Sequence, residues 1–418
     1  MGLKSGLDMA PYQASLDWID RQQKAMVRQV EAWSCVNSGS HNLPGLADMG
    51  AKVTEAFSAL GGNFESIALP PSSHVTPSGD LEPLPLGPVY RFQKRPDAKR
   101  RVLLTGHLDT VFAKDSPFQV PRWLDDTLLN GPGVADMKGG LIVMLHALLA
   151  VERSGLADDL GWEVLISSDE EIGSIGSAAI LTERAPHAHI GLTYEPALAD
   201  GTLAGARKGS GNFSIVVRGR AAHAGRAFHE GRNAVVALAE VIAALDGLNG
   251  QREGVTVNPA VISGGAAPNI VPDMAVLRVN ARVKTHEDAR WVEQALEEIR
   301  TRISSREGYD LMVHGGFNRP PKPISGANQA LFDVVARCGD ALGLKVAYQA
   351  TGGCCEGNNL AAAGLPNVDT LGVRGGKIHS SDEFVLVDSF AERAKLSAVI
   401  MLGFAQGHFD QALMQEGA

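Results

Sequence analysis

Short apolar runs, rich in valine, isoleucine and leucine, recur through the first half of the chain and again near its end. They occupy residues 101–105, 162–167, 190–194 and 367–371. Runs of this length and composition predict strands that are buried on both faces. Around them, apolar positions recur at helical spacing at residues 16–33, 46–60 and 139–153. Strands and helices that alternate in this way predict an α/β domain with a largely parallel sheet flanked by helices.

The pattern changes between residues 208 and 319. Three runs predict strands and two stretches between them have helical periodicity, at 213–217, 255–262, 274–283, 233–245 and 286–303. The proline-rich stretch 319–323 is typical of a linker, because proline stiffens a crossing segment and stops secondary structure. We therefore expect an inserted α+β domain at 208–319, between two parts of one domain at 1–207 and 320–418. The Pro/Ser-rich stretch 70–88 predicts a loop.

Composition and charge narrow the class of partner. The 418 residues are 44% hydrophobic, and a net charge of -9 comes with no basic block. This balance argues against nucleic acid and anionic membranes and favours a small-molecule substrate. The N-terminus, which begins Met-Gly-Leu-Lys-Ser-Gly, lacks the apolar stretch of about 7 to 15 residues that a secretory signal needs. No run approaches the roughly 18 apolar residues of a membrane span. Four cysteines without C-x-x-C spacing fit a reducing compartment, so we expect a cytoplasmic protein.

Histidines and carboxylates follow three of the predicted strands. His107 and Asp109 come after the first run, Glu170 and Glu171 after the second, and Glu195 after the third. Carboxyl ends of strands in an open α/β sheet share one edge, where ligands collect. Asp136 in the glycine-rich loop 131–140 and His379 after the last strand extend this set. Imidazole and carboxylate ligands without sulfur suit zinc and, less selectively, cobalt or manganese.

The spacing within two of these clusters has a physical reason. Side chains alternate along a strand, so Asp109 can accept the second ring N–H of His107 and orient that ring toward a metal. The adjacent carboxylates of Glu170 and Glu171 point in different directions, so one can bind a metal while the other takes a proton from water. A single His-x-Asp or Glu-Glu pair usually lies on the surface and has no functional role. Their combination at successive strand ends favours a metal site.

At these positions the chain resembles the zinc-dependent peptidase family that includes glutamate carboxypeptidase of the carboxypeptidase G type, aminoacylase, acetylornithine deacetylase and succinyl-diaminopimelate desuccinylase. The resemblance covers nearly the whole chain. The motifs that carry it are Gly-His107-Leu-Asp109-Thr-Val, Gly-Pro-Gly-Val-Ala-Asp136-Met-Lys-Gly-Gly, Ser-Asp-Glu170-Glu171-Ile-Gly-Ser, Glu195-Pro, Gly-Arg-Ala-Ala-His223-Ala-Gly and His379-Ser-Ser-Asp-Glu.

The resemblance implies a site with two zinc ions in each subunit. Asp136 would bridge the two ions, with His107 and Glu195 completing one site and Glu171 and His379 completing the other. Glu170 would then be the general base.

The same resemblance assigns a role to the inserted domain. His223 would stabilise the oxyanion in the active site of another subunit, so a homodimer is expected and the insert would serve as a dimerisation or lid domain. A structural turn histidine is the alternative for His223.

Recognition of a substrate carboxylate is expected from a guanidinium, whose planar fork matches the carboxylate. Arg319 and Arg282 are the candidates, and Asn269 can add an amide hydrogen bond. Any of the three could instead hold the domains together. Glu195 stands where the aminopeptidase branches of the family usually carry aspartate, which favours the carboxypeptidase and deacylase branches.

The expected function is therefore cleavage of the amide bond to a C-terminal amino acid, in N-acyl amino acids or peptides, by a two-zinc hydrolase. An aminoacylase, deacetylase or dipeptidase of the same family is the alternative. A non-enzymatic binding module would lack a ligand or the base, and here each of those positions is filled. Related enzymes place a loop with Gly-Gly and polar residues near the substrate. Residues 352–358 keep the glycines of this loop but exchange its polar residues, so the sequence does not determine which substrate side chain is preferred.

Overall fold

The apolar runs near residues 100, 160 and 190 form the centre of one mixed sheet in the computed structural model, which describes residues 7–414. The six strands follow the order β1 (Asn63–Ile67), β4 (Val89–Lys94), β8 (Leu160–Ser167), β5 (Arg100–His107), β9 (Ile190–Thr193) and β19 (Asn367–Val368). The four strands from β8 to β19 run parallel, while β1 and β4 pair antiparallel. Every residue of β8 is buried because both faces of the sheet are covered.

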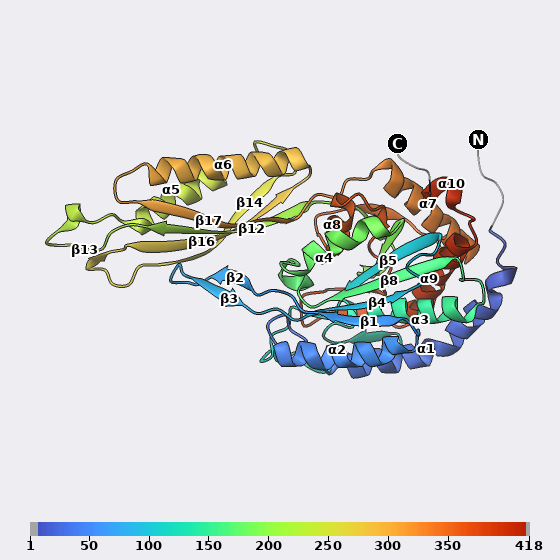
Figure 1. The fold of residues 1–418 in the computed structure, drawn as a ribbon. Helices are drawn as coiled ribbons and strands as arrows, with labels where there is room; N and C mark the ends of the chain where they lie inside the picture. Colours follow the sequence, from blue (N-terminus) through green and yellow to red (C-terminus); the bar gives the residue numbers. More distant parts are fainter. Residues whose placement is uncertain (1–6, 415–418) are drawn as a thin grey trace.

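Helices cover both faces of this sheet (Figure 1). One face packs against α1 (Gln13–Ser34), α2 (Leu43–Ser58), α3 (Lys138–Arg153), α7 (Gly326–Ala341) and α9 (Ser389–Ala405). The other packs against α4 (Ser177–Arg184) and α8 (Glu356–Ala362), and α10 (Asp410–Leu413) ends the described chain. Side chains alternate between the two cores, as Leu103 and Leu104 of β5 show. The predicted α/β architecture is confirmed.

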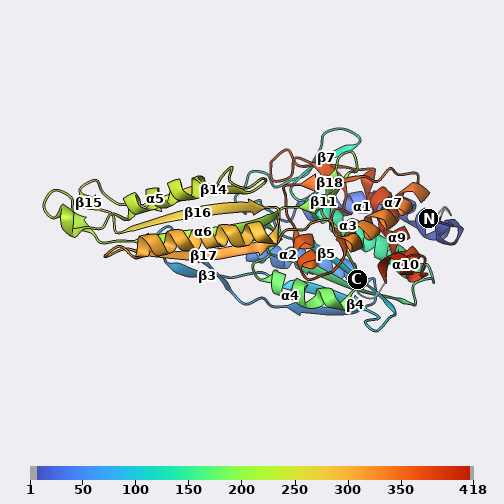
Figure 2. The same ribbon diagram turned by 90° about the horizontal axis from the view of Figure 1, so that it is seen from above.

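A second, elongated lobe extends from this body (Figures 1 and 2). Its antiparallel sheet has the order β14 (Thr256–Gly264), β16 (Met274–Val283), β12 (Gly209–Arg218) and β17 (Asp310–Arg319), and α5 (Ala234–Asp246) and α6 (His286–Ser304) cover one face. The sequence pattern assigned no strand to β17, because Gly315 and Gly316 interrupt its weak alternation of buried positions. The domain boundaries expected from the sequence stay a prediction.

The chain crosses between the lobes twice, and the two crossings lie side by side. The backbone N–H of Arg207 donates to the carbonyl of Lys322 at 2.8 Å, and the N–H of Lys322 donates back at 3.0 Å. The proline-rich stretch after Arg319 therefore runs along the first crossing.

The stretch 70–88, expected to be a loop, forms a hairpin of β2 (Ser72–Val75) and β3 (Leu81–Leu84) that reaches the sheet of the second lobe (Figure 1). Val75 packs on Val216 and Val276, on the face opposite α5 and α6. Arg278 Nη2 donates to the Val75 carbonyl at 2.9 Å. The sequence pattern of residues 70–88 could not predict this hairpin, because the residues that it packs against lie in a distant segment of the chain.

The remaining segments contain short strands in three small sheets. They are β6 (Arg122–Trp123), β7 (Leu128–Asn130), β10 (Ala197–Leu198), β20 (Arg374–Gly376) and β21 (Phe384–Leu386) in one sheet, the parallel pair β11 (Leu203–Arg207) and β18 (Tyr348–Thr351), and the pair β13 (Ala222–His223) and β15 (Ile270–Val271). No helix within residues 7–414 is long and apolar enough to cross a membrane. Residues 1–6, from which the lack of a leader was inferred, lie outside the described part.

Candidate metal centre and active site

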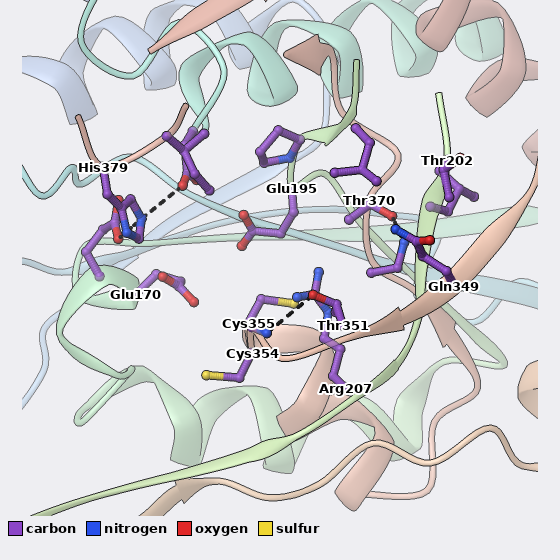
Figure 3. A pocket seen from close by; sticks show the side chains of 18 residues that line it. Glu170, Glu195, Thr202, Arg207, Gln349, Thr351, Cys354, Cys355, Thr370 and His379 are labelled. Carbon is purple, nitrogen blue, oxygen red and sulfur yellow. Dashed lines mark hydrogen bonds and ion pairs between the residues drawn. The ribbon is translucent and has the colours of Figure 1, made fainter. Parts of the chain in front are cut away.

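The histidines and carboxylates selected from the sequence meet at the carboxyl edge of the large sheet. His107 ends β5, Glu170 and Glu171 follow β8, and Glu195 follows β9. Parallel strands bring these side chains to one edge. Ligand atoms of His107, Glu170 and Glu195 lie within 4.8 Å of one another, and so do those of His107, Asp136 and Glu171. Figure 3 shows Glu170, Glu195 and His379 around the same pocket.

Asp136 stands between the two histidines. Its Oδ1 is 3.2 Å from His107 Nε2, and its Oδ2 is 3.2 Å from His379 Nε2. Beyond them, His107 Nε2 is 3.8 Å from Glu195 Oε1, and His379 Nε2 is 3.1 Å from Glu171 Oε2. Two groups of donors thus share one central carboxylate.

The donor chemistry fits divalent cations. Burial raises the pKa of Glu171 and of Glu195, and the charge of Asp136 raises both further. Glu195 Oε1 is buried and has no hydrogen-bond partner among the described residues. Crowded, buried carboxylates need positive charge and ligand bonds, which a divalent cation supplies. The residues present could therefore hold two such ions, with oxygen and imidazole ligands only.

Asp109 holds more than the ring of His107. The nearest acceptor to His107 Nδ1 is the main-chain oxygen of Asp109 at 3.0 Å, with the carboxylate Oδ1 at 3.4 Å. Because a carbonyl only accepts, Nδ1 donates to it, and Nε2 faces the site. The carboxylate also accepts from the backbone N–H groups of Glu170 and Glu171, at 3.2 and 3.1 Å, and from Ser40 Oγ at 2.7 Å. Asp109 thus positions ligands from two strands.

Glu383 is a positioning residue that sequence reasoning missed. It is buried and accepts hydrogen bonds from the backbone N–H groups of Gly133, Ala135 and Asp136, at 3.1, 2.9 and 3.0 Å. These bonds fix the glycine-rich loop that presents Asp136. Glu383 ends the motif that begins at His379, but spacing along the chain does not reveal which loop it supports.

The arginine candidates lie close to the site but are already engaged. Arg319 is buried; its Nη2 donates to Glu170 Oε1 at 2.6 Å and its Nη1 to Asn359 Oδ1 at 2.6 Å. Arg282 Nη1 lies 3.1 Å from Cys354 Sγ. Neither arginine is among the described residues that line the cleft. Their role in binding a substrate carboxylate stays a prediction.

His223 and Asn269 lie far from the other predicted site residues. His223 belongs to β13 at the free end of the second lobe (Figure 1). The carbonyl of Asn269 accepts from the N–H of Ala224 at 2.9 Å, so both residues share this tip. Within one chain the structure does not bring them to the metal residues.

The cleft beside the carboxylates has a volume of about 270 Å³. Its other end, which sequence reasoning missed, is lined by Thr202, Arg207, Gln349, Thr351 and Thr370 (Figure 3). Cys354 and Cys355 form part of the wall and are free thiols.

Comparisons with known proteins show which family and fold the chain resembles. The sequence profile of the peptidase family M20/M25/M40 matches residues 103–402. Carboxypeptidase G2 of Pseudomonas sp. (strain RS-16) is 27% identical over 403 residues, which cover 96% of this chain and 93% of that protein. Among solved structures, a tripeptidase from Staphylococcus aureus aligns with a TM-score of 0.70 at 22% identity, covering 92% of this chain and 99% of that one. A dinuclear metal binding peptidase from Bacillus subtilis aligns with a TM-score of 0.61 at 14% identity, covering 93% and 99%.

Proposed function

The chain belongs to the peptidase family M20/M25/M40, and on that premise we propose that it is a two-zinc hydrolase that releases a C-terminal amino acid from N-acyl amino acids or peptides. The family makes it a metal-dependent hydrolase. The observation that carries the finer proposal is the shared carboxylate Asp136 between two groups of donors, with Glu170 beside them. The similarity to carboxypeptidase G2 along nearly the whole chain favours a carboxypeptidase over an aminopeptidase.

The ligand roles follow the arrangement of the donors. Asp136 would be shared by both ions, His107 and Glu195 would hold one, and Glu171 and His379 the other. When bound, zinc lowers the pKa of water toward about 7 and polarises a carbonyl group.

Glu170 is suited to move the proton. One of its oxygens accepts from Arg319, which fixes the orientation of the carboxylate beside His107 and Glu195. We assign to it the transfer of a proton from the attacking water to the leaving amine. His223 from a second copy of the chain would donate to the oxyanion.

An edge of the second lobe supports the proposed homodimer. Strand β14 pairs with β16 on one side and is the edge of its sheet. Its Val261 and Ile262 are 51% and 61% exposed, and Val236 of the adjacent α5 is 53% exposed. An apolar edge strand is a template for pairing with another copy. We assign to this edge the contact between two copies that the proposed role of His223 requires.

Removal of metal tests the proposed function. Metal-depleted enzyme is expected to lose hydrolysis of N-acyl amino acids, and zinc is expected to restore it, with cobalt or manganese compared in parallel. The measurement is release of the free amino acid from a panel of N-acyl amino acids and free dipeptides. Preference for peptides with a free amino group would favour an aminopeptidase or dipeptidase. Full activity after verified metal loss would refute the proposal.

Arg319→Ala tests carboxylate recognition. For substrates with a free α-carboxylate, kcat/KM is expected to fall by about 10- to 150-fold, mainly through KM, because a charged hydrogen bond of roughly 1.5 to 3 kcal/mol is lost. Matched substrates whose carboxylate is amidated should lose less. The remaining loss on them would report the contact with Glu170.

Arg282→Ala serves as the comparison, because its guanidinium contacts Asn280 and Cys354 and not Glu170. If Arg319→Ala lowered the activity on acid and amide by the same factor, Arg319 would only brace Glu170. Carboxylate recognition would then have to come from another residue.

A further inference from the structure

The first turn of α8 holds two buried polar side chains that the proposed mechanism does not use. The helix begins at Glu356, directly after Cys354 and Cys355 of the cleft wall (Figure 3). Glu356 is 0% exposed and Asn359 is 5% exposed, and neither is among the described residues that line the cleft. Residues three positions apart share one face of a helix. Both side chains bond to groups that hold Glu170.

Asn359 fixes the guanidinium that contacts Glu170. Its Oδ1 accepts from Arg319 Nη1 at 2.6 Å, and its Nδ2 donates to the carbonyl of Asn318 at 2.9 Å. The amide therefore cannot turn without losing a bond. The other end of the guanidinium, Nη2, donates to the main-chain oxygen of Glu170 at 3.2 Å and to its Oε1 at 2.6 Å. Because the guanidinium is planar and rigid, the amide of Asn359 sets the direction from which Glu170 is held.

Glu356 fixes the strand end from which Glu170 comes. Its Oε1 accepts from Ser167 Oγ at 2.5 Å. Ser167 is the last residue of β8 and pairs with His107 at the end of β5. Glu170 follows three positions later in the chain. The bond between Glu356 and Ser167 therefore sets where the loop that carries Glu170 begins.

Glu356 does not compete with Glu170 for the guanidinium. Burial raises the pKa of Glu356 to about 8, against the opposing effects of Ser167 and Arg319. The side chain is therefore largely uncharged at neutral pH, and the charge of Arg319 is left to Glu170. Its bond to Ser167 does not require a charge, because the oxygen of an uncharged acid also accepts.

We propose that Asn359 and Glu356 are positioning residues that hold the general base Glu170 in place, Asn359 through Arg319 and Glu356 through Ser167. The inference rests on the proposed function. Proton transfer requires the base to lie within about 2.6 to 3.2 Å of the attacking water or one further water away. Two buried contacts that reach the base from its side chain and from its strand meet this requirement.

Asn359→Ala is expected to lower kcat by about 10- to 100-fold, because a displacement of about 1 Å can cost 10²-fold in rate. Metal content should not change, since the side chain bonds to Arg319 and Asn318 and to no proposed ligand among the described residues. A matched pair of substrates, an N-acyl amino acid and its amidated form, removes any effect on carboxylate binding. The base serves both, so kcat should fall by the same factor on both.

Asn328→Ala is the matched control. Asn328 is 4% exposed, and its amide oxygen accepts from the N–H of Asn367 at 2.9 Å, with no bond to Arg319 or Glu170. This variant should lower the unfolding temperature without lowering kcat. A loss of kcat as large as that of Asn359→Ala would show that any buried amide gives this effect and would overturn the role of Asn359.

A double-mutant cycle tests whether Asn359 acts through the base. In a Glu170→Gln background the base is already absent, so adding Asn359→Ala should lower the residual kcat little. An equal fold-loss in both backgrounds would make Asn359 a structural residue and would refute its positioning role.

Substitutions at the second contact give an independent test if Asn359→Ala does not fold. Glu356→Ala and Ser167→Ala remove the same hydrogen bond from its two ends and are expected to lower kcat by similar factors, with metal content unchanged. Glu356→Gln keeps an acceptor oxygen for Ser167 and should retain most of kcat. If glutamine were as damaging as alanine, the bond to Ser167 would not carry the effect, and the role of Glu356 would be wrong.

The outcomes also separate the inference from the proposed function. An active native enzyme whose kcat is unchanged in Asn359→Ala and Glu356→Ala would refute the inference alone. Loss of metal in these variants would place their effect in the assembly of the metal site and would also refute it. Inactivity of the zinc-loaded native enzyme on the whole substrate panel would refute the proposed function and the inference with it.

Discussion

Glu170→Gln is expected to keep both metals bound and to lower kcat by about 10²- to 10⁴-fold, the usual contribution of a general base. Glutamine preserves the shape of the side chain, and its carbonyl oxygen can still accept from Arg319. Its amide cannot take a proton from water. The measurement combines the metal content per chain with kcat on the preferred N-acyl amino acid.

The structure makes this experiment discriminating, because Glu170 lies within ligand distance of His107 and Glu195. If the variant lost metal but kept appreciable activity per remaining ion, Glu170 would be a ligand and the roles of the adjacent pair would be reversed. Glu171→Gln is the control. Its partner His379 belongs to the proposed metal site, so this variant should lose metal together with activity.

His223→Ala is expected to leave the metal content intact and to lower kcat by about 10²- to 10³-fold, the value of one oxyanion donor. The physical reason is that such a donor acts mainly in the transition state. His223 is exposed on β13, at the tip of the second lobe, so its substitution should not disturb a core. An unchanged kcat would mean that His223 is a turn residue.

A mixture of two inactive variants tests whether His223 acts across subunits. When His223→Ala and Glu170→Gln chains are refolded together, one of the two sites in a mixed dimer would combine native Glu170 with native His223. Partial recovery of activity is therefore expected, and each variant refolded alone is the control. Verified mixed dimers without activity would contradict the role across subunits.

Local sequence patterns determined the framework of the site. The apolar runs that became β5, β8 and β9 are buried strands because each carries a continuous apolar stretch, and a residue that follows such a run lies at the sheet edge. This is why the sequence alone could group His107, Glu171 and Glu195. Residue type then limited the chemistry, since imidazole and carboxylate donors suit a divalent cation.

Only the tertiary structure decided which polar groups meet. Arg319 reaches Glu170 across 149 positions of sequence, and Arg207 shares Asp369 with Lys322. In the hairpin at residues 72–84, Val75 packs on Val216 and Val276, and its carbonyl accepts from Arg278 across 203 positions of sequence. The prolines and serines of the hairpin give no sign of this contact. Hydrogen bonds require atoms to come within about 3 Å, a distance set by how separate segments pack rather than by periodicity along one of them. The sequence alone thus determined the kinds of groups at the sheet edge, and packing determined which arginine is occupied and which one opens on the cleft.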